Sequence, residues 1–359
     1  MRCLVRLSGV LAAILFATPV FAQIAIPEIP FESAPNFLKL PANLYFGEVV
    51  GVSVNSMGHV FVYSRTGSPR ITLSTNRAFW RPSARLYEFD QNGQFVRELS
   101  GLYSMSFAHA VRVDPQDNVW VIDEGSSTIL KLDPQWRIQM VLGRKPEALR
   151  VPTPPEQGEP GGGAGIPGDN FNRPTDVAWD PAGNIFISDG HGANSNARVA
   201  KFDKNGKFIK SWGSRGSGPG QFDTPHGIAV DANGNVYVAD RSNKRIQVFD
   251  NDGNFKTQYN NVGTPFTLCI TKGPRQYLYS ANSNFPGSME NGEIYKMELD
   301  GRILGKFGHA GRELGDIGVG HSIECRTENE VYVAEVWNWR AQKLILHPER
   351  AKLAGVSAR

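Results

Sequence analysis

The chain has 359 residues, with 38 Lys and Arg against 35 Asp and Glu, so its formal net charge at pH 7 is +3. This near-neutral balance argues against a nucleic-acid partner, because proteins that bind nucleic acids usually carry a strongly basic face. The length accommodates one large domain or two ordinary ones.

The first residues have the pattern of an export signal. Arg2 and Arg6 supply the positive start, residues 10–16 form a short apolar run, and Ala22 is a small residue where a signal peptidase would cut. The apolar run is shorter than the roughly 20 residues that a transmembrane helix needs. We therefore predict a signal peptide over residues 1–22, no membrane span, and export to the periplasm or beyond.

The clearest structural unit lies at residues 225–250, which read PHGIAVDANGNVYVADRSNKRIQVFD. Its apolar residues alternate in short runs, and the runs are separated by residue types that form tight turns. Residues 254–259 then read as a fourth, outer strand. One unit is therefore predicted to be a four-stranded antiparallel sheet.

This unit occurs six times, and its copies start 40 to 66 residues apart. Four-stranded repeats at roughly 40–50 residues are typical of β-propeller blades, and the longer intervals contain inserted loops. We predict an all-β fold, a six-bladed β-propeller over residues 23–350, followed by a C-terminal tail at 351–359. Aligned on the first strand, the six copies begin at Val50, His109, Thr175, His226, Phe266 and His321.

The last copy has only three strands, so another segment has to complete it. We expect Phe37 to Phe46, which precede the first copy, to supply the outer strand. Closing the ring in this way covers two sheet edges that would otherwise stay unpaired.

Two further expectations concern packing. Trp337 and Trp339 are expected to lie between blades, as large aromatic residues usually do. Cys269 and Cys325 are the two cysteines that remain after signal cleavage. They fall on opposite alternation phases of their strands, so a disulfide between them is possible but not expected.

The longest interruption of the repeats covers residues 144–173 and is dense in Pro and Gly. Such a composition predicts a surface loop. The loop is either a tolerated insertion or a lid, because it joins an outer strand to the next inner strand at one rim of the ring.

Three histidines occupy the same strand position in alternate blades. His109, His226 and His321 begin the inner strands of blades two, four and six, so they are related by about 120° and can converge on the axis. Three imidazoles with an open fourth position form the usual catalytic zinc site. The alternatives are that each histidine makes a local hydrogen bond or that the register is a coincidence.

The ends of the second strands are predicted to surround the end of the central channel at which the three histidines lie, which we call the mouth. Of the residues there, Arg65 and Arg241 suit a carboxylate or an oxyanion, which a guanidinium binds through two hydrogen bonds. A surface pairing with a nearby acid such as Asp240 is the alternative. The acids one position earlier, Asp123, Asp189, Asp240 and Glu335, are expected to form turns and cap strands. The six positions at the mouth hold Arg65, Glu124, Gly190, Arg241, Asn282 and Val336.

These residues together resemble a known family. The repeats look like NHL-type repeats, and the chain after the signal resembles the lyase domain of peptidylglycine α-amidating enzymes. That family is a six-bladed propeller that splits a peptidyl-α-hydroxyglycine into a peptide amide and glyoxylate, with a zinc held by three histidines. The resemblance implies that His109, His226 and His321 are the zinc ligands. It also implies that Arg65 in YSRTGS and Arg241 in ADRSNKRIQ are active-site arginines.

The chain departs from the family at two functional positions. His191 follows SDG in blade three, where the family has a tyrosine thought to act as a base. We take His191 as the candidate base, because imidazole titrates near neutral pH; the alternative is a polar loop residue without a role in catalysis. Ser322 stands where the family has an aspartate that helps to bind a structural calcium. Val52 and Val111 could still offer backbone carbonyls to Ca²⁺, but the carboxylate is missing.

Three functions are weighed against each other. The first is a zinc-dependent lyase that breaks the C–N bond of an α-hydroxylated amide, with a small molecule or peptide carrying an anionic group as its substrate. The second is a non-catalytic propeller that binds a protein or a small ligand. The third is a lactonase-like, calcium-dependent hydrolase, which would want carboxylates and amides at the channel centre. We expect the protein to be a monomer.

Overall fold

The computed structural model describes residues 26–66, 70–73, 77–80, 84–102, 105–143, 171–193, 195–282 and 292–350. The predicted export signal and its cleavage site, most of the 144–173 loop and the C-terminal tail lie outside the described residues. Within the described part of the chain, no helix is long and apolar enough to span a membrane.

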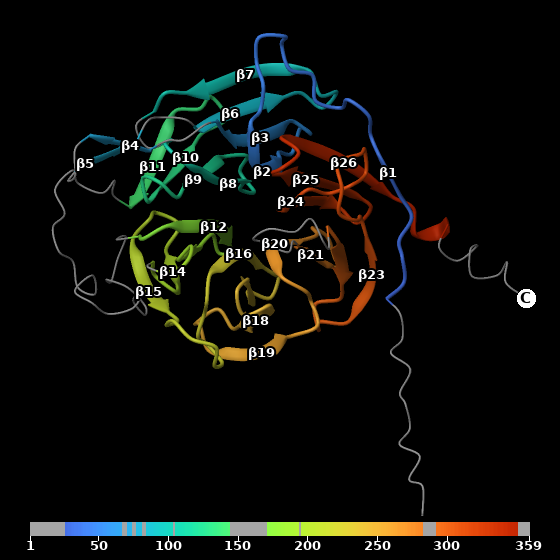
Figure 1. Ribbon diagram of the computed structural model, residues 1–359. Helices are drawn as coiled ribbons and strands as arrows, with labels where there is room; N and C mark the ends of the chain where they lie inside the picture. Colours follow the sequence, from blue (N-terminus) through green and yellow to red (C-terminus); the bar gives the residue numbers. More distant parts are fainter. Residues whose placement is uncertain are drawn as a thin grey trace, which may run out of the picture.

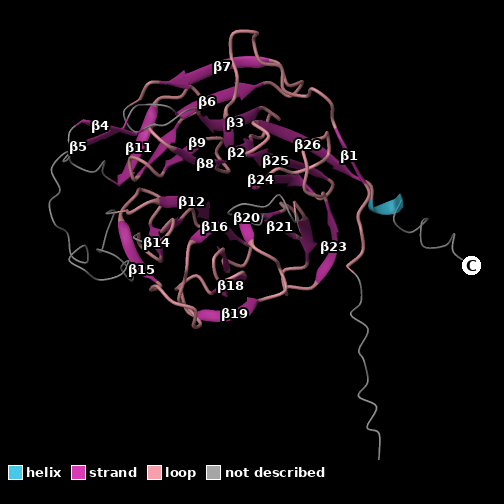
Figure 2. Ribbon diagram, in the orientation of Figure 1, coloured by secondary structure: helices cyan, strands magenta, loops and turns pink. Residues whose placement is uncertain are grey.

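Six four-stranded antiparallel sheets are arranged in a ring (Figure 1). Almost all regular structure is strand, apart from one short helical turn near the C-terminus (Figure 2). The prediction of an all-β, six-bladed propeller is confirmed. Blade one contains β2 (Glu48–Val54), β3 (Val60–Arg65), β6 (Ala84–Phe89) and β7 (Phe95–Ser100). Blade two contains β8 (Ala108–Val113), β9 (Val119–Asp123), β10 (Thr128–Leu132) and β11 (Ile138–Gly143). Blade three contains β12 (Pro174–Trp179), β13 (Ile185–Asp189), β14 (Arg198–Phe202) and β15 (Phe208–Trp212).

The remaining blades repeat this order from the axis outward. Blade four contains β16 (Pro225–Val230), β17 (Val236–Asp240), β18 (Arg245–Phe249) and β19 (Phe255–Tyr259). Blade five contains β20 (Pro265–Ile270), β21 (Leu278–Asn282), β22 (Ile294–Met297) and β23 (Ile303–Phe307). Blade six contains β24 (Gly320–Thr327), β25 (Glu330–Glu335), β26 (Arg340–Leu346) and β1 (Phe31–Ser33). A separate hairpin, β4 (Arg70–Leu73) with β5 (Arg77–Trp80), is inserted in blade one.

The four acids at the ends of second strands cap their blades, as predicted. Asp240 accepts a hydrogen bond from the backbone N–H of Asp223 (2.7 Å) and another from Arg245 Nε (2.8 Å) at the start of the third strand. The same pairing with an arginine occurs at Asp189 (Arg198) and Glu335 (Arg340). Asp123 instead accepts hydrogen bonds from backbone N–H groups and a serine hydroxyl. Burying such carboxylates is tolerated because each is hydrogen-bonded.

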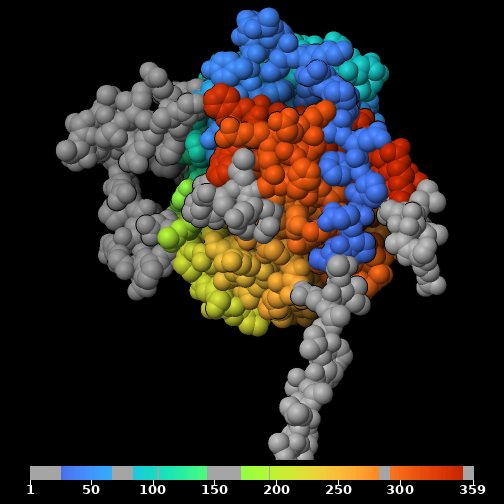
Figure 3. Space-filling view, turned by 45° about the vertical axis from the view of Figure 1, so that its right-hand side comes forward, coloured from blue at the N-terminus to red at the C-terminus, as the bar shows by residue number. Residues whose placement is uncertain are grey.

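The ring is closed by the N-terminal strand β1, but the residues differ from those expected. β1 pairs with β26 through Phe31 opposite Leu346 and Ser33 opposite Leu344. Figure 3 shows the N-terminal segment lying along the side of the last blade. The assignment of this strand to Phe37–Phe46 is wrong, because Pro41 interrupts that segment with a turn. Phe37 packs instead on blade six and Phe46 on blade one.

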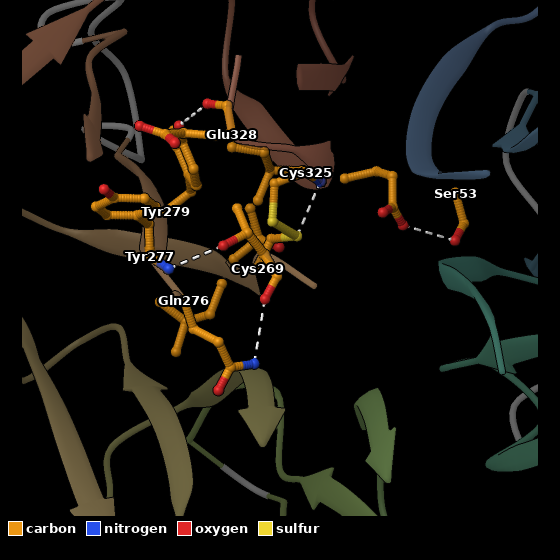
Figure 4. Close-up of a disulfide and its surroundings, with 12 residues drawn as sticks. Ser53, Cys269, Gln276, Tyr277, Tyr279, Cys325 and Glu328 are labelled. Carbon is orange, nitrogen blue, oxygen red and sulfur yellow. Dashed lines mark hydrogen bonds between the residues drawn. A yellow bond between two sulfur atoms is a disulfide. The ribbon is translucent and has the colours of Figure 1, made fainter. Parts of the chain in front are cut away.

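Cys269 of β20 and Cys325 of β24 form a disulfide between the inner strands of blades five and six (Figure 4). The expectation of no disulfide is therefore wrong. Cys269 has to point toward blade six and Cys325 back toward blade five, and these directions are opposite faces of the two inner strands. Opposite alternation phases therefore bring the two sulfurs together. The bridge joins residues 56 positions apart. Closing a loop of that length reduces the entropy of the unfolded chain, which raises its free energy by about 4 kcal/mol at 25 °C in the simple chain model.

The two tryptophans of blade six are not packed between blades. Trp337 and Trp339 are 38% and 57% exposed. The expectation is wrong because β25 ends at Glu335 and β26 begins at Arg340, so both residues lie in the connecting turn.

A buried arginine ties four blades together across the channel. Arg112 of β8 donates from Nε and Nη2 to the two carboxylate oxygens of Asp176 in blade three, at 2.8 and 2.6 Å. Its Nη1 donates to the carbonyl of Ile323 in blade six (2.9 Å), and its Nη2 also reaches Thr267 Oγ1 in blade five (3.2 Å). A buried charge of this kind is stable only when it is fully paired.

Replacement of Arg112 by Met should lower the free energy of unfolding by about 3–5 kcal/mol, because Asp176 would be left as an unpaired buried carboxylate. Urea unfolding of the two proteins measures this difference. Arg302→Met is the matched control, since Arg302 pairs with Glu298 at the surface and its side chain is 64% exposed. Equal stabilities of the Arg112 and Arg302 variants would contradict the role of the central arginine.

A chain that begins at Ala34 lacks β1 and should expose the edge of β26, so we expect a lower melting temperature and faster aggregation. A chain that begins at Ile26 keeps β1 and is the control. Thermal melts and light scattering compare the two chains. If both melt alike and stay monomeric, the closing strand is dispensable.

Candidate functional site

The three predicted histidines lie on β-bulges at the start of inner strands. In β8 the pairing with the second strand skips from Ala108 to Ala110, so His109 is left out of the ladder. The same shift leaves out His226 in β16 and His321 in β24. A bulge redirects the side chain of its extra residue, and all three rings turn toward the axis.

The three imidazoles meet at the axis. The ring centroids of His109, His226 and His321 lie 4.7 to 4.8 Å apart. Each ring offers a nitrogen, and these nitrogens lie within 4.8 Å of one another. The structure thus brings together the residues that the sequence placed at one register.

Each of these rings is held by the blade that follows it. Nδ1 lies within hydrogen-bond distance of a backbone carbonyl, that of Thr175 for His109 (2.7 Å), Phe266 for His226 (2.7 Å) and Val50 for His321 (2.9 Å). A carbonyl only accepts, so Nδ1 carries the hydrogen and Nε2 keeps its lone pair. The Nε2 atoms of His109 and His226 are buried, and no described residue offers them a hydrogen-bond partner.

Burial keeps these rings uncharged. Burial, together with nearby imidazole and guanidinium groups, lowers the pKa of His109 and His226 well below the usual value and that of His321 to about 3. Neutral imidazoles that share one point, each with its other nitrogen bound to a carbonyl, are the arrangement of metal ligands. The three histidines therefore fit a metal ion.

His191 lies beside this cluster, directly after β13. Its ring centroid is 5.0 Å from that of His109 and 5.2 Å from that of His226. Its Nδ1 lies 3.3 Å from Glu124 Oε1, and its Nε2 lies 3.2 Å from Arg241 Nη1. Burial lowers the pKa of His191, although the Glu124 carboxylate opposes this effect.

The two predicted arginines differ in their partners. Arg241 forms no ion pair with any described carboxylate; it lies over the ring of Phe266 at 4.9 Å, and burial lowers its pKa to about 10. Asp240 pairs with Arg245, so the surface-pairing alternative does not hold for Arg241. Arg65 does pair with an acid, Glu48, and lies over the ring of Phe107 at 3.9 Å.

The sequence interpretation missed the roles of Glu124 and Arg173. Glu124 is buried after β9, and Arg173, from the loop before β12, donates to it from Nε (2.7 Å) and Nη2. Glu124 was visible at the mouth register, but its partner comes from a loop that no repeat pattern places. Asn282 lies one position earlier in its blade than we expected. It pairs with Pro265 as Asp240 pairs with Pro225, so it corresponds to the capping acids and not to the residues at the mouth that follow them.

A calcium ion does not fit the next layer of residues along the channel below the histidines, where Arg112 and Asp176 lie. Ser322 offers no carboxylate there, and both oxygens of Asp176 are engaged by Arg112. The small cavity between the two levels is lined by that same guanidinium. A buried cation already balances the acid, so carbonyls such as those of Val52 and Val111 would face Ca²⁺ without the negative charge that it prefers.

Sequence comparisons point in the same direction as the geometry. Residues 222–249, in blade four, match the NHL repeat. The chain is 32% identical over 206 residues to peptidylglycine alpha-amidating monooxygenase of Rattus norvegicus, a match that covers 55% of this chain and 18% of the relative. It is 25% identical over 362 residues to peptidyl-alpha-hydroxyglycine alpha-amidating lyase 1 of Drosophila melanogaster, covering 88% and 60% of the two chains. The matches thus span less than two thirds of the length of these two relatives.

Other similarities are less specific for an activity. NHL repeat-containing protein 3 of Mus musculus is 29% identical over 274 residues, covering 72% of this chain and 71% of the relative. The structure of a gluconolactonase from Xanthomonas campestris superposes with a TM-score of 0.54 at 14% identity, covering 89% and 99% of the two chains, and it shows the fold alone. The chain is therefore a six-bladed β-propeller with an NHL repeat, similar in sequence to amidating lyases.

Proposed function

We propose that the protein is a metal-dependent lyase that breaks the C–N bond of an α-hydroxylated amide. The observation that carries this proposal is the convergence of three histidines whose Nδ1 atoms are all engaged, with His191 and Arg241 beside them. Three neutral imidazoles favour zinc among the common ions. When bound, zinc supplies a Lewis acid that favours loss of the substrate hydroxyl proton.

The chain's own residues would move one proton. His191 accepts the proton of the substrate hydroxyl, and the oxygen's electrons form the C=O bond of an aldehyde. The C–N bond breaks, its electron pair stays on nitrogen, and His191 returns the proton there. A peptidyl-α-hydroxyglycine would thus give a peptide amide and glyoxylate, with no other reactant consumed. His191 suits both steps because a neutral imidazole accepts and then donates a proton.

Arg241 would bind the anionic end of the substrate. Its guanidinium is partly buried and has no carboxylate partner among the described residues, so a substrate carboxylate would supply the missing negative charge. In the free protein Arg241 Nη1 instead lies 3.2 Å from His191 Nε2. Transfer of Arg241 to the substrate carboxylate therefore frees the nitrogen that His191 needs as a base. Arg65, in a blade on the opposite side of the channel, would bind a carbonyl.

Two other functions have weaker support. A non-catalytic binding propeller is favoured by the similarity to NHL repeat-containing protein 3, whose name states no reaction. A lactonase-like hydrolase would share the fold of the gluconolactonase, but its calcium needs oxygen ligands at the axis, where this chain has imidazoles. We also propose that the protein is exported by its N-terminal signal and acts as a monomer on a peptide or small molecule.

His226→Ala should remove most of the bound zinc, because a catalytic zinc usually keeps three protein ligands. His109→Ala and His321→Ala should do the same. Elemental analysis of the purified proteins measures the metal. His59→Ala is the control, because His59 pairs with Glu88 away from the three histidines. Full zinc occupancy in any of the three site variants would rule out a shared site.

Arg241→Lys should reduce turnover efficiency although the charge is kept, because lysine cannot make the two parallel hydrogen bonds of a guanidinium. Loss of one charged hydrogen bond costs about 1.5–3 kcal/mol, which is roughly a tenfold to more than hundredfold decrease. Glyoxylate release from a peptidyl-α-hydroxyglycine measures the rate, and Arg302→Lys is the control. Unchanged activity would argue against substrate binding by Arg241, and loss of zinc together with activity would make Arg241 a structural support of the site.

A further inference from the structure

Four side chains at the mouth form one chain of contacts around the buried Glu124. Arg173 donates to Glu124, Glu124 lies next to His191, and His191 lies next to Arg241. These residues come from the ends of second strands in three blades and from the loop before β12. Glu124 is 5% exposed, and its Oε2 has no hydrogen-bond partner among the described residues.

Glu124 is the one acceptor among the described neighbours of the two ring nitrogens of His191. Nδ1 lies 3.3 Å from Glu124 Oε1 and 3.2 Å from Arg173 Nη2, and Nε2 lies 3.2 Å from Arg241 Nη1. A guanidinium donates hydrogen bonds and cannot accept one. Among these described contacts Glu124 is therefore the acceptor, and it is next to Nδ1.

The position of this hydrogen decides what the ring can do. With the hydrogen on Nδ1, Nε2 keeps its lone pair and faces Arg241. Without Glu124, the described neighbours of both ring nitrogens would be guanidinium groups. The ring N–H would then point at a positively charged donor whichever nitrogen carried the hydrogen. In proteins a hydrogen bond from one ring nitrogen of a histidine to a carboxylate commonly decides which nitrogen carries the hydrogen.

We propose that Glu124 is the positioning residue of His191, and that it fixes the tautomer in which Nε2 is the acceptor. The effect on catalysis rests on the proposed function, in which His191 is the base. The tautomer itself does not, since it follows from the contacts of the free protein. Glu124 acts through His191 and needs no contact with the substrate.

The first test is independent of activity. Long-range ¹H–¹⁵N correlation spectra of metal-free protein distinguish a ring hydrogen on Nδ1 from one on Nε2, and His191→Phe assigns the His191 signal. We expect Nδ1–H in the parent protein and in Glu124→Gln, whose amide oxygen can still accept. Glu124→Leu should lose this preference. An unchanged Nδ1–H tautomer in Glu124→Leu would overturn the proposal.

If Glu124→Leu does not fold, a second variant still tests the proposal. Arg173→Met removes the competing donor and keeps the carboxylate, so the His191 hydrogen should stay on Nδ1. A hydrogen on Nε2 in Arg173→Met would refute the assignment. Glu88→Leu is the matched control, because Glu88 is also a buried acid between a histidine and an arginine, His59 and Arg97, in the outer part of blade one.

The second test uses kinetics of glyoxylate release in zinc-loaded protein. Glu124→Leu should lower kcat by about tenfold to hundredfold, less than the roughly hundredfold to ten-thousandfold contribution of a general base, because His191 itself remains. KM should stay nearly unchanged because Arg65 and Arg241 remain. In the His191→Phe background the same change should have almost no further effect. Equal losses in both backgrounds would show a structural role and overturn the proposal. If no variant or parent releases glyoxylate, the proposed function fails, whereas the spectra still decide the role of Glu124.

Discussion

The hydrogen bond from each axial histidine to the next blade is the contact on which the site depends. His109, His226 and His321 are fixed by carbonyls of blades three, five and one. Each ring is therefore oriented by a blade other than its own, and the three free nitrogens meet only when the whole ring of blades is closed. Closure of the ring of blades and orientation of the three proposed metal ligands therefore depend on each other.

Below the histidines, the centre of the channel is stabilised by a buried arginine. Arg112 makes hydrogen bonds to Asp176, Thr267 and Ile323 from three other blades. A guanidinium is a permanent cation with several donors in fixed directions, so it can satisfy acceptors that come from different sides. Together with the Cys269–Cys325 disulfide, this contact joins inner strands that are far apart in the sequence.

The mouth above the histidines is asymmetric, although the blades repeat. Blades one to four bring Arg65, Glu124, His191 and Arg241 to it, whereas Val336 of blade six is buried in an apolar cluster. The charged part is nearly self-paired except for Arg241. An anionic substrate would therefore find its partner at Arg241, beside the proposed base and the proposed metal.

The sequence by itself determined the number of blades, the axial register of the three histidines and the capping acids, because these follow from local alternation and a repeated turn chemistry. It did not determine which short segment completes blade six, since three residues of β1 carry too weak a pattern. The Cys269–Cys325 bridge and the Arg173–Glu124–His191 contacts were decided by the tertiary structure. They depend on which faces of neighbouring blades meet and on where an irregular loop returns, and no local periodicity encodes either.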